Sequence, residues 1–221
     1  MFVGKTGLLH DELDKAANFN KLDFSAKSIP QAIIRPAWPV GLYKNDQLNN
    51  CVVAALANSR RTESLVNDGC DWFTDDNEII KFYAAVANTP IAEIQNAPGL
   101  YPIDVFRYVM TNGFKDGQQV PDVFPYVGVI PNSKYSIVST MAHQCSAFLA
   151  IDLYEEDMDT ATPWSKAPTG NLVGGHAIIS RGCSGMSEND TLTICTWGQE
   201  VKATWLWLST RLQLAYALMW S

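Results

Sequence analysis

Apolar residues recur along the chain with two different spacings, and the change falls near residue 135. Before that point, the run CVVAALANSRR that starts at Cys51 is apolar on all sides for two turns, which predicts a helix buried on every side. Apolar positions at helical spacing predict a second helix after Asp75, which is a favoured N-terminal capping residue. A third helix is predicted from Pro102, a favoured first-turn residue, to the Asn-Gly pair at 112–113.

After residue 135 the apolar segments become short, rich in β-branched or aromatic residues, and bounded by Gly, Asn, Asp or Ser. This pattern favours strands, which are predicted at 146–153, 175–181, 191–197 and 204–209. Because the helices come first and the strands second, the sequence predicts an α+β fold in which a helical lobe packs against a sheet lobe.

The first 40 residues have the features of an arm and not of a domain. They are polar at first and then interrupted by Pro30, Pro36 and Pro39, which favours an extended segment packed on the rest of the protein. We therefore expect an N-terminal arm at 1–40 and a single domain at 41–221. Within that domain, the helical lobe is predicted at about 41–135 and the β lobe at about 136–221.

Composition and charge exclude several classes of protein. The 221 residues include 16 Lys+Arg and 23 Asp+Glu, a net charge of −7, so a nucleic-acid partner is not expected. No stretch approaches the roughly 20 apolar residues of a membrane span, so no membrane partner is expected either. The first 15 residues carry charges early and contain no apolar signal segment, so secretion by a signal peptide is not expected.

Five cysteines stand at positions 51, 70, 145, 183 and 195. Their number is odd and none forms a CxxC pair, so neither a complete disulfide framework nor a zinc ribbon fits. The acidic run YEEDMD at 154–159 is typical of a solvated loop and has no metal-ligand spacing. The sequence therefore predicts no metal and no other cofactor.

Cys51 differs from the other cysteines because it begins a predicted helix, directly after two candidate N-cap residues, Asn49 and Asn50. The unsatisfied N–H groups at a helix start favour thiolate over thiol. A thiolate becomes an acyl-transfer nucleophile when a histidine pairs with it. Among the three histidines, His176 is the best candidate, since two glycines precede it and an apolar strand follows it.

Four segments together resemble the papain-like cysteine peptidase family. They are YKNDQLNNCVVAALAN around Cys51, PGLYPIDVFRYVMTNGF from Pro98, LVGGHAIISRGC around His176, and TLTICTWGQEVKATWLWLS from Thr191. The resemblance covers about 40–221 and implies a papain-like two-lobe fold. In that fold a helical lobe packs against an antiparallel β-sheet or barrel lobe, with the site in the cleft between them.

The resemblance also implies roles for particular residues. Cys51 would be the nucleophile and His176 the base and then the acid. Asn45, six residues before Cys51, would form the oxyanion hole with the backbone N–H of Cys51. Gln47 lies nearby, and an alignment with a one-residue gap would instead select Asp46, whose carboxylate would repel the oxyanion.

Two further positions depart from the family pattern. Cys195 stands where the family has the Asn that orients the imidazole, and a thiol is only a weak acceptor. Trp197, which shields that contact from water in the family, is retained. For binding substrate, the resemblance selects Gly99, Leu100 and Gly175, with Leu100 narrowing the cleft where a second glycine is usual.

Two functions follow from these residues. The first is a papain-like cysteine peptidase that hydrolyses peptide or isopeptide bonds in a peptide or protein substrate by a Cys-His thiolate mechanism. The second is a papain-fold structural or binding protein with weak or no activity, whose partners would be other virion proteins. The weak or absent activity would follow from Cys195 in place of the orienting Asn. The bacteriophage origin rests on the Asn-Asp-x-x-x-x-Cys segment, which resembles small papain-like proteins encoded by bacteriophages and implies a cytoplasmic or virion location.

Overall fold

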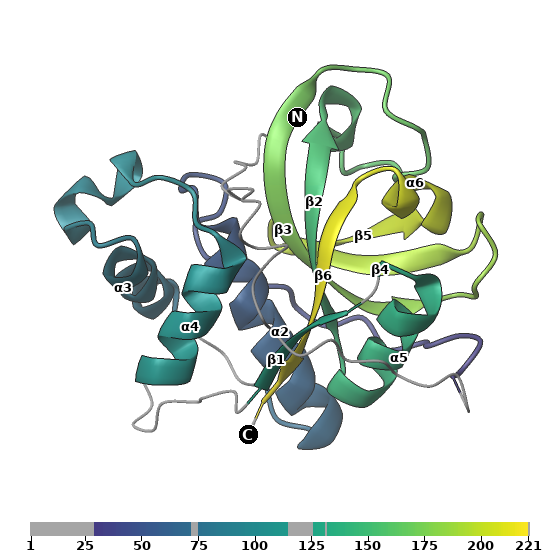
Figure 1. Ribbon diagram of the computed structural model, residues 1–221, viewed down its shortest axis with the longest axis horizontal. Helices are drawn as coiled ribbons and strands as arrows, with labels where there is room; N and C mark the ends of the chain where they lie inside the picture. Colours follow the sequence, from purple (N-terminus) through teal and green to yellow (C-terminus); the bar gives the residue numbers. More distant parts are fainter. Residues whose placement is uncertain (1–28, 72–74, 115–125, 131, 221) are drawn as a thin grey trace.

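A computed structural model describes residues 29–71, 75–114, 126–130 and 132–220. Helices α2, α3 and α4 form one side of the molecule and a sheet forms the other (Figure 1). The helices are α2 (Cys51–Asn67), α3 (Asp76–Val86), α4 (Pro102–Asn112), α5 (Lys134–Gln144) and α6 (Trp205–Ser209), with short 3₁₀ turns η1 (Ile91–Asn96) and η2 (Glu155–Met158). The strands are β1 (Tyr126–Ile130), β2 (Ala147–Tyr154), β3 (Leu172–Cys183), β4 (Thr191–Thr196), β5 (Gln199–Thr204) and β6 (Leu212–Met219).

The six strands form one antiparallel sheet in the order β1-β6-β2-β3-β4-β5. The predicted α+β fold is confirmed. The sheet is open, with β1 and β5 at its edges, so the closed barrel that the family resemblance allowed is not present. In the described part of the chain, every helix is too short or too polar to cross a membrane.

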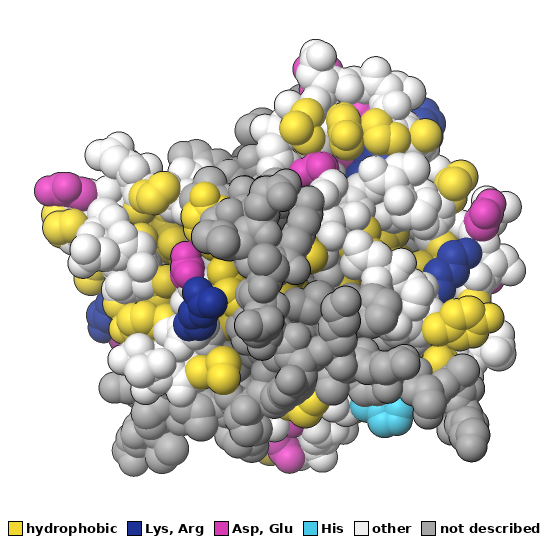
Figure 2. Space-filling view, viewed as in Figure 1, with side chains coloured by type: hydrophobic (Ala, Val, Ile, Leu, Met, Phe, Trp, Pro, Cys, Tyr) yellow, Lys and Arg dark blue, Asp and Glu magenta, His cyan; other side chains and the backbone are white. Residues whose placement is uncertain are grey.

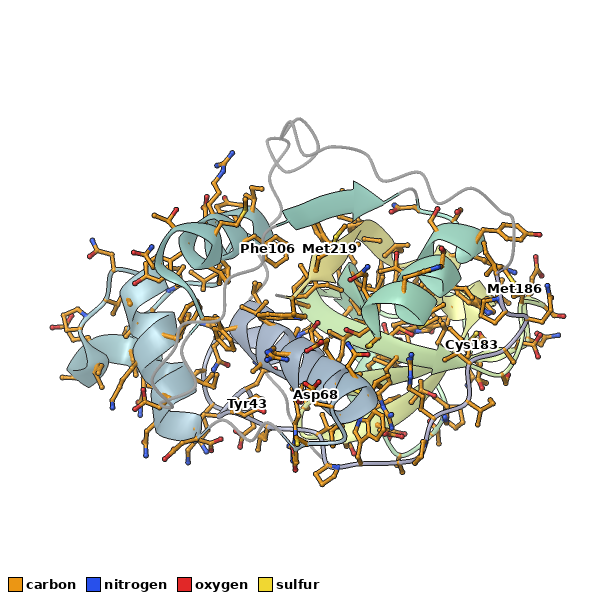
Figure 3. All side chains as sticks on the ribbon, turned by 90° about the horizontal axis from the view of Figure 1, so that it is seen from below. Tyr43, Asp68, Phe106, Cys183, Met186 and Met219 are labelled. Atoms are coloured by element: carbon orange, nitrogen blue, oxygen red, sulfur yellow. The ribbon has the colours of Figure 1, made fainter. Side chains whose placement is uncertain are left out.

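Both faces of the sheet are covered. Alternate residues of the strands divide between two apolar clusters, as the pleat requires. One cluster contains Phe148 and Ala150 with much of α2, and the other contains Leu149 and Ile151 with α5 and α6. Helix α2 lies between the sheet and helices α3 and α4, as seen from a second direction in Figure 3. The expectation that this helix is buried on every side holds for its first nine residues, 51–59.

The predicted ends of the helices agree with the structure at three places. The Asp75 side chain accepts a hydrogen bond from the N–H of Asn77, Pro102 occupies the first turn of α4, and Gly113 ends α4 with φ +76°. A helix at 134–144 was not predicted. It carries the exposed His143 near its end, whereas His10 lies outside the described residues.

The segment 204–209 was predicted as a strand and is helix α6, so that prediction is wrong. Its alternating Trp and Leu residues fit a strand, but a short apolar run does not distinguish strand from helix. The side chain of Thr204 caps the turn by accepting a hydrogen bond from the N–H of Trp207. Trp205, Trp207 and Leu208 are then buried while Leu206 stays exposed, which one helical turn achieves and a flat strand would not.

Residues 29–40 run in extended form over the body. Ile33 pairs with Cys183 of β3 through two backbone hydrogen bonds. This close approach needs Gly182, since a Cβ there would lie 2.6 Å from the carbonyl oxygen of Ile33. Residues 1–28 of the arm predicted at 1–40 lie outside the described residues.

Arg35 attaches this segment to the end of α5. Its guanidinium donates to the carbonyl oxygens of Cys145 at 2.8 Å and Met141 at 3.0 Å, and to that of Arg181 on β3. The carbonyls of Met141 and Cys145 lie at the end of α5, where the helix provides no N–H donor for them. Charged hydrogen bonds of this kind contribute roughly 1.5–3 kcal/mol.

We therefore expect Arg35→Ala to lower the free energy of unfolding by about 2 kcal/mol, measured by urea denaturation. The neighbouring Ile34, which is 78% exposed, provides the control, and Ile34→Ala should have little effect. Equal stabilities of the two variants would contradict a role for Arg35 in attaching the segment.

Candidate active site

Cys51 is the first residue of α2 and is completely buried. The expected N-cap, Asn50, makes no capping hydrogen bond through its side chain. Its amide instead donates to the carbonyl oxygen of Tyr43 at 2.8 Å and accepts from Asn45 at 3.1 Å. The first turn of α2 also contains no acidic residue that would offset the positive field at Cys51.

Asn45 braces the loop that leads to Cys51. It is buried, and its Nδ2 donates to the carbonyl oxygen of Leu48 at 3.4 Å and to Oδ1 of Asn50 at 3.1 Å. Both amide hydrogens therefore have acceptors, and an oxyanion would have to displace one of them. The amide of Gln47 is exposed and makes a single long hydrogen bond, 3.4 Å to Asp46, so it is a second candidate donor.

His176 lies on β3, the strand against which α2 packs. The imidazole is completely buried, and its Nε2 lies 2.7 Å from Oγ1 of Thr196. Its Nδ1 has no hydrogen-bond partner among the described residues. Burial lowers the pKa of His176 to about 3, so the imidazole is neutral at ordinary pH.

Trp197 covers the imidazole as expected for a shielding residue. The two rings stack with centroids 4.5 Å apart and planes 29° from parallel. Trp197 has φ +44°, which is unusual for a bulky residue and places strain at this turn. The following Gly198 has φ +74°, and a Cβ there would lie 3.0 Å from Cβ of Leu42. The Trp-Gly turn thus packs on the loop that precedes Cys51.

Cys195 does not face the imidazole, which corrects the position expected for it. It lies opposite Ile179 on β3 and belongs to the apolar cluster of α2. Burial raises the pKa of its thiol, and the nearby Arg181 guanidinium offsets only part of that rise. Because adjacent residues of a strand point to opposite faces, Thr196 takes the position beside His176. Alignment by sequence position alone selected the residue on the wrong face.

The three residues expected to bind substrate lie in two places. Gly99 is half-buried and Leu100 buried, and Leu100 packs in the cluster that contains Cys51. Asn49 fixes this segment by donating to the carbonyl oxygen of Ala97 at 3.1 Å. Gly175 is buried in β3 directly before His176, opposite Asp152 of β2.

The other thiols provide an internal comparison for Cys51. Cys70 is exposed, whereas the remaining four cysteines are buried and none forms a disulfide. Burial raises the pKa values of Cys145 and Cys183, and that of Cys195 to about 11. No group of three or more metal-binding side chains occurs within the described ranges.

No protein-family model matches this sequence, and none of the curated proteins matches it. Solved structures do match. Xylellain, a cysteine protease from Xylella fastidiosa, superposes with a TM-score of 0.73 at 13% identity, covering 98% of this chain and 96% of that one. ProCathepsin B S9 from Trypanosoma congolense gives 0.67 at 9% identity, covering 98% and 86%. Procathepsin L 3 from the larval midgut of Tenebrio molitor gives 0.63 at 10% identity, covering 99% and 77%. The chain therefore has the fold of the papain-like cysteine proteases.

Thr196 is the site residue that sequence reasoning missed. Two signals were present, namely its hydroxyl and its place next to the Trp-Gly pair. The register that turns it toward His176 is a property of the sheet and could not be read from spacing.

Proposed function

We propose that this protein is a papain-like thiol hydrolase that cleaves peptide or isopeptide bonds, with Cys51 as nucleophile and His176 as base and then acid. The observation that carries the proposal is the state of His176. One nitrogen is held by Thr196, the ring is stacked on Trp197, and Nδ1 is buried without a partner among the described residues. A buried unsatisfied nitrogen is costly and is typical of a group kept for chemistry.

The proposed reaction uses a neutral pair. Nδ1 of His176 accepts the proton of the Cys51 thiol as the sulfur bonds to the substrate carbonyl carbon. The imidazolium then gives that proton to the amine as the carbon–nitrogen bond breaks, and water hydrolyses the thioester with Nδ1 again as base. The backbone N–H of Cys51 and an amide from Asn45 or Gln47 would stabilise the oxyanion.

A papain-fold binding or structural protein, for example a bacteriophage virion component, is the second candidate. The observation that favours it is the complete burial of both Cys51 and His176. A substrate carbonyl reaches the sulfur only if the residues over it move aside. The amide of Asn45 already donates two hydrogen bonds, which also favours a binding or structural protein.

Thiol labelling tests the proposal. The experiment uses the Cys70→Ser variant as its starting protein, because Cys70 is the exposed cysteine. We expect iodoacetamide, and a peptidyl epoxide directed at cysteine peptidases, to modify Cys51 first at about pH 6, as located by mass spectrometry. The reason is that Cys51 combines a helix N-terminus with a histidine, whereas burial raises the pKa of the other buried thiols.

Cys51→Ala is the matched control and should abolish the epoxide label. Labelling of Cys183 or Cys195 ahead of Cys51 would contradict the choice of nucleophile. A folded protein whose Cys51 reacts with neither reagent would favour the binding or structural protein.

A further inference from the structure

Thr196 and Cys195 are neighbours on β4, yet they lie on opposite faces of the sheet. Cys195 lies opposite Ile179 of β3 and belongs to the apolar cluster of α2. Thr196 is 4% exposed and reaches Nε2 of His176 with an oxygen–nitrogen distance of 2.7 Å. Of these two neighbours, therefore, Thr196 is the one that contacts Nε2 of the His176 imidazole.

The contacts of Thr196 and Trp197 limit the freedom of the ring. Trp197 stacks on one face with centroids 4.5 Å apart, and Thr196 holds Nε2. Rotation of the ring would break the short hydrogen bond in a place that water does not reach, since the ring is completely buried. The remaining nitrogen, Nδ1, is thereby kept in one direction.

The hydroxyl differs from an amide oxygen in one respect that matters for proton transfer. An amide oxygen only accepts, so it selects the tautomer with the proton on Nε2. A threonine hydroxyl accepts or donates, so the 2.7 Å contact is compatible with both tautomers. Only the tautomer with the proton on Nε2 leaves Nδ1 able to accept the proton of a thiol.

We propose that Thr196 is the positioning residue of His176: its Oγ1 accepts a hydrogen bond from Nε2–H and holds Nδ1 ready to take the proton of Cys51. The inference rests on the proposed function for its chemical consequence. The thiol S–H bond breaks, the Nδ1–H bond forms, and the Nε2–H bond to Thr196 persists throughout. Thr196 itself neither gains nor loses a proton in this step.

Two measurements on uniformly ¹⁵N-labelled full-length protein with Cys70→Ser test the proposal. Long-range ¹H–¹⁵N correlation spectra report the tautomer of His176, and mass spectrometry gives the rate at which iodoacetamide modifies Cys51. In this starting protein, in which Thr196 is intact, we expect His176 to have the Nε2–H tautomer, with an Nε2 proton that exchanges slowly with solvent.

Thr196→Val keeps the shape and removes the acceptor. We expect it to lose the slow-exchanging Nε2 proton and to slow the alkylation of Cys51 roughly tenfold to hundredfold, as follows from a buried donor left unsatisfied. Thr196→Ser keeps the hydroxyl and should restore both signals. Thr193→Val, on the same strand with its hydroxyl bonded to Lys202 at 2.7 Å, is the matched control and should change neither.

Several outcomes would overturn the inference. One is an Nδ1–H tautomer in the starting protein. Another is an unchanged His176 spectrum in folded Thr196→Val. A third is a change caused by Cys195→Ala in place of Thr196→Val. If Cys51 proves unreactive in every protein, the proposed hydrolase function fails, while the spectra still decide whether Thr196 holds the imidazole.

Discussion

Arg211→Ala is expected to lower the free energy of unfolding by about 3–5 kcal/mol, because it leaves a buried carboxylate without its cation. Arg211 is completely buried and Asp157 is 1% exposed. The guanidinium donates twice to the carboxylate, from Nε at 2.8 Å and from Nη2 at 2.9 Å. Trp207 Nε1 donates to the same carboxylate at 2.8 Å, which ties α6 to this pair.

Urea denaturation with a common slope would measure this loss. Arg107→Ala is the matched control, since its pair with Asp104 spans 3.8 Å and both side chains are more than half exposed. Such an exposed pair contributes less than about 1 kcal/mol. A loss below 1 kcal/mol for Arg211→Ala would show that the Asp157 carboxylate finds another partner or water.

The second large effect is a dependence of stability on pH that arises from His176. Burial lowers the pKa of this group in the folded protein to about 3, whereas its pKa in the unfolded chain is the ordinary value of 6.5. Below pH 6.5 the unfolded chain binds a proton that the folded protein does not bind. The stability contributed by neutral His176 is therefore complete above about pH 6.5 and is lost as the pH falls toward 3.

Between pH 7 and pH 5 this difference amounts to about 2 kcal/mol of unfolding free energy. His176→Gln removes the titrating group, so its stability should fall less over the same interval by about that amount. His143→Gln, at an exposed site on α5, is the control and should retain the full dependence. Parallel curves for the starting protein and His176→Gln would contradict the burial of a neutral imidazole.

These two results bear on function in different ways. The Arg211–Asp157 pair stabilises the turn η2 at the start of the connection between β2 and β3, and β3 carries His176. A neutral His176 makes the proposed chemistry a proton transfer during attack, without a preformed thiolate–imidazolium pair. Thiol labelling of Cys51 then separates a hydrolase from a binding protein with the same fold.

Much of the framework followed from patterns of apolar residues. The helices from 51, after 75 and from 102, and the strands at 146–153, 175–181 and 191–197, were predicted because packing on one or two faces leaves a period in the sequence. The strand predicted at 204–209 failed because a short apolar run in the sequence does not distinguish one helical turn from a strand. The sheet also begins with β1 at 126–130, ahead of the predicted boundary of the β lobe at 136.

By itself, the sequence determined the α+β order of elements and the placement of Cys51 at the start of a buried helix. It also placed His176 on a strand, because a helix start and a strand are local features written in nearby residues. Only the tertiary structure decided that Thr196 and not Cys195 contacts His176, that Asn45 donates to Asn50, and that the side chains of Cys51 and His176 are both buried. Strand register, side-chain hydrogen bonds between distant segments and solvent exclusion depend on how separate elements meet, which no spacing along the chain specifies.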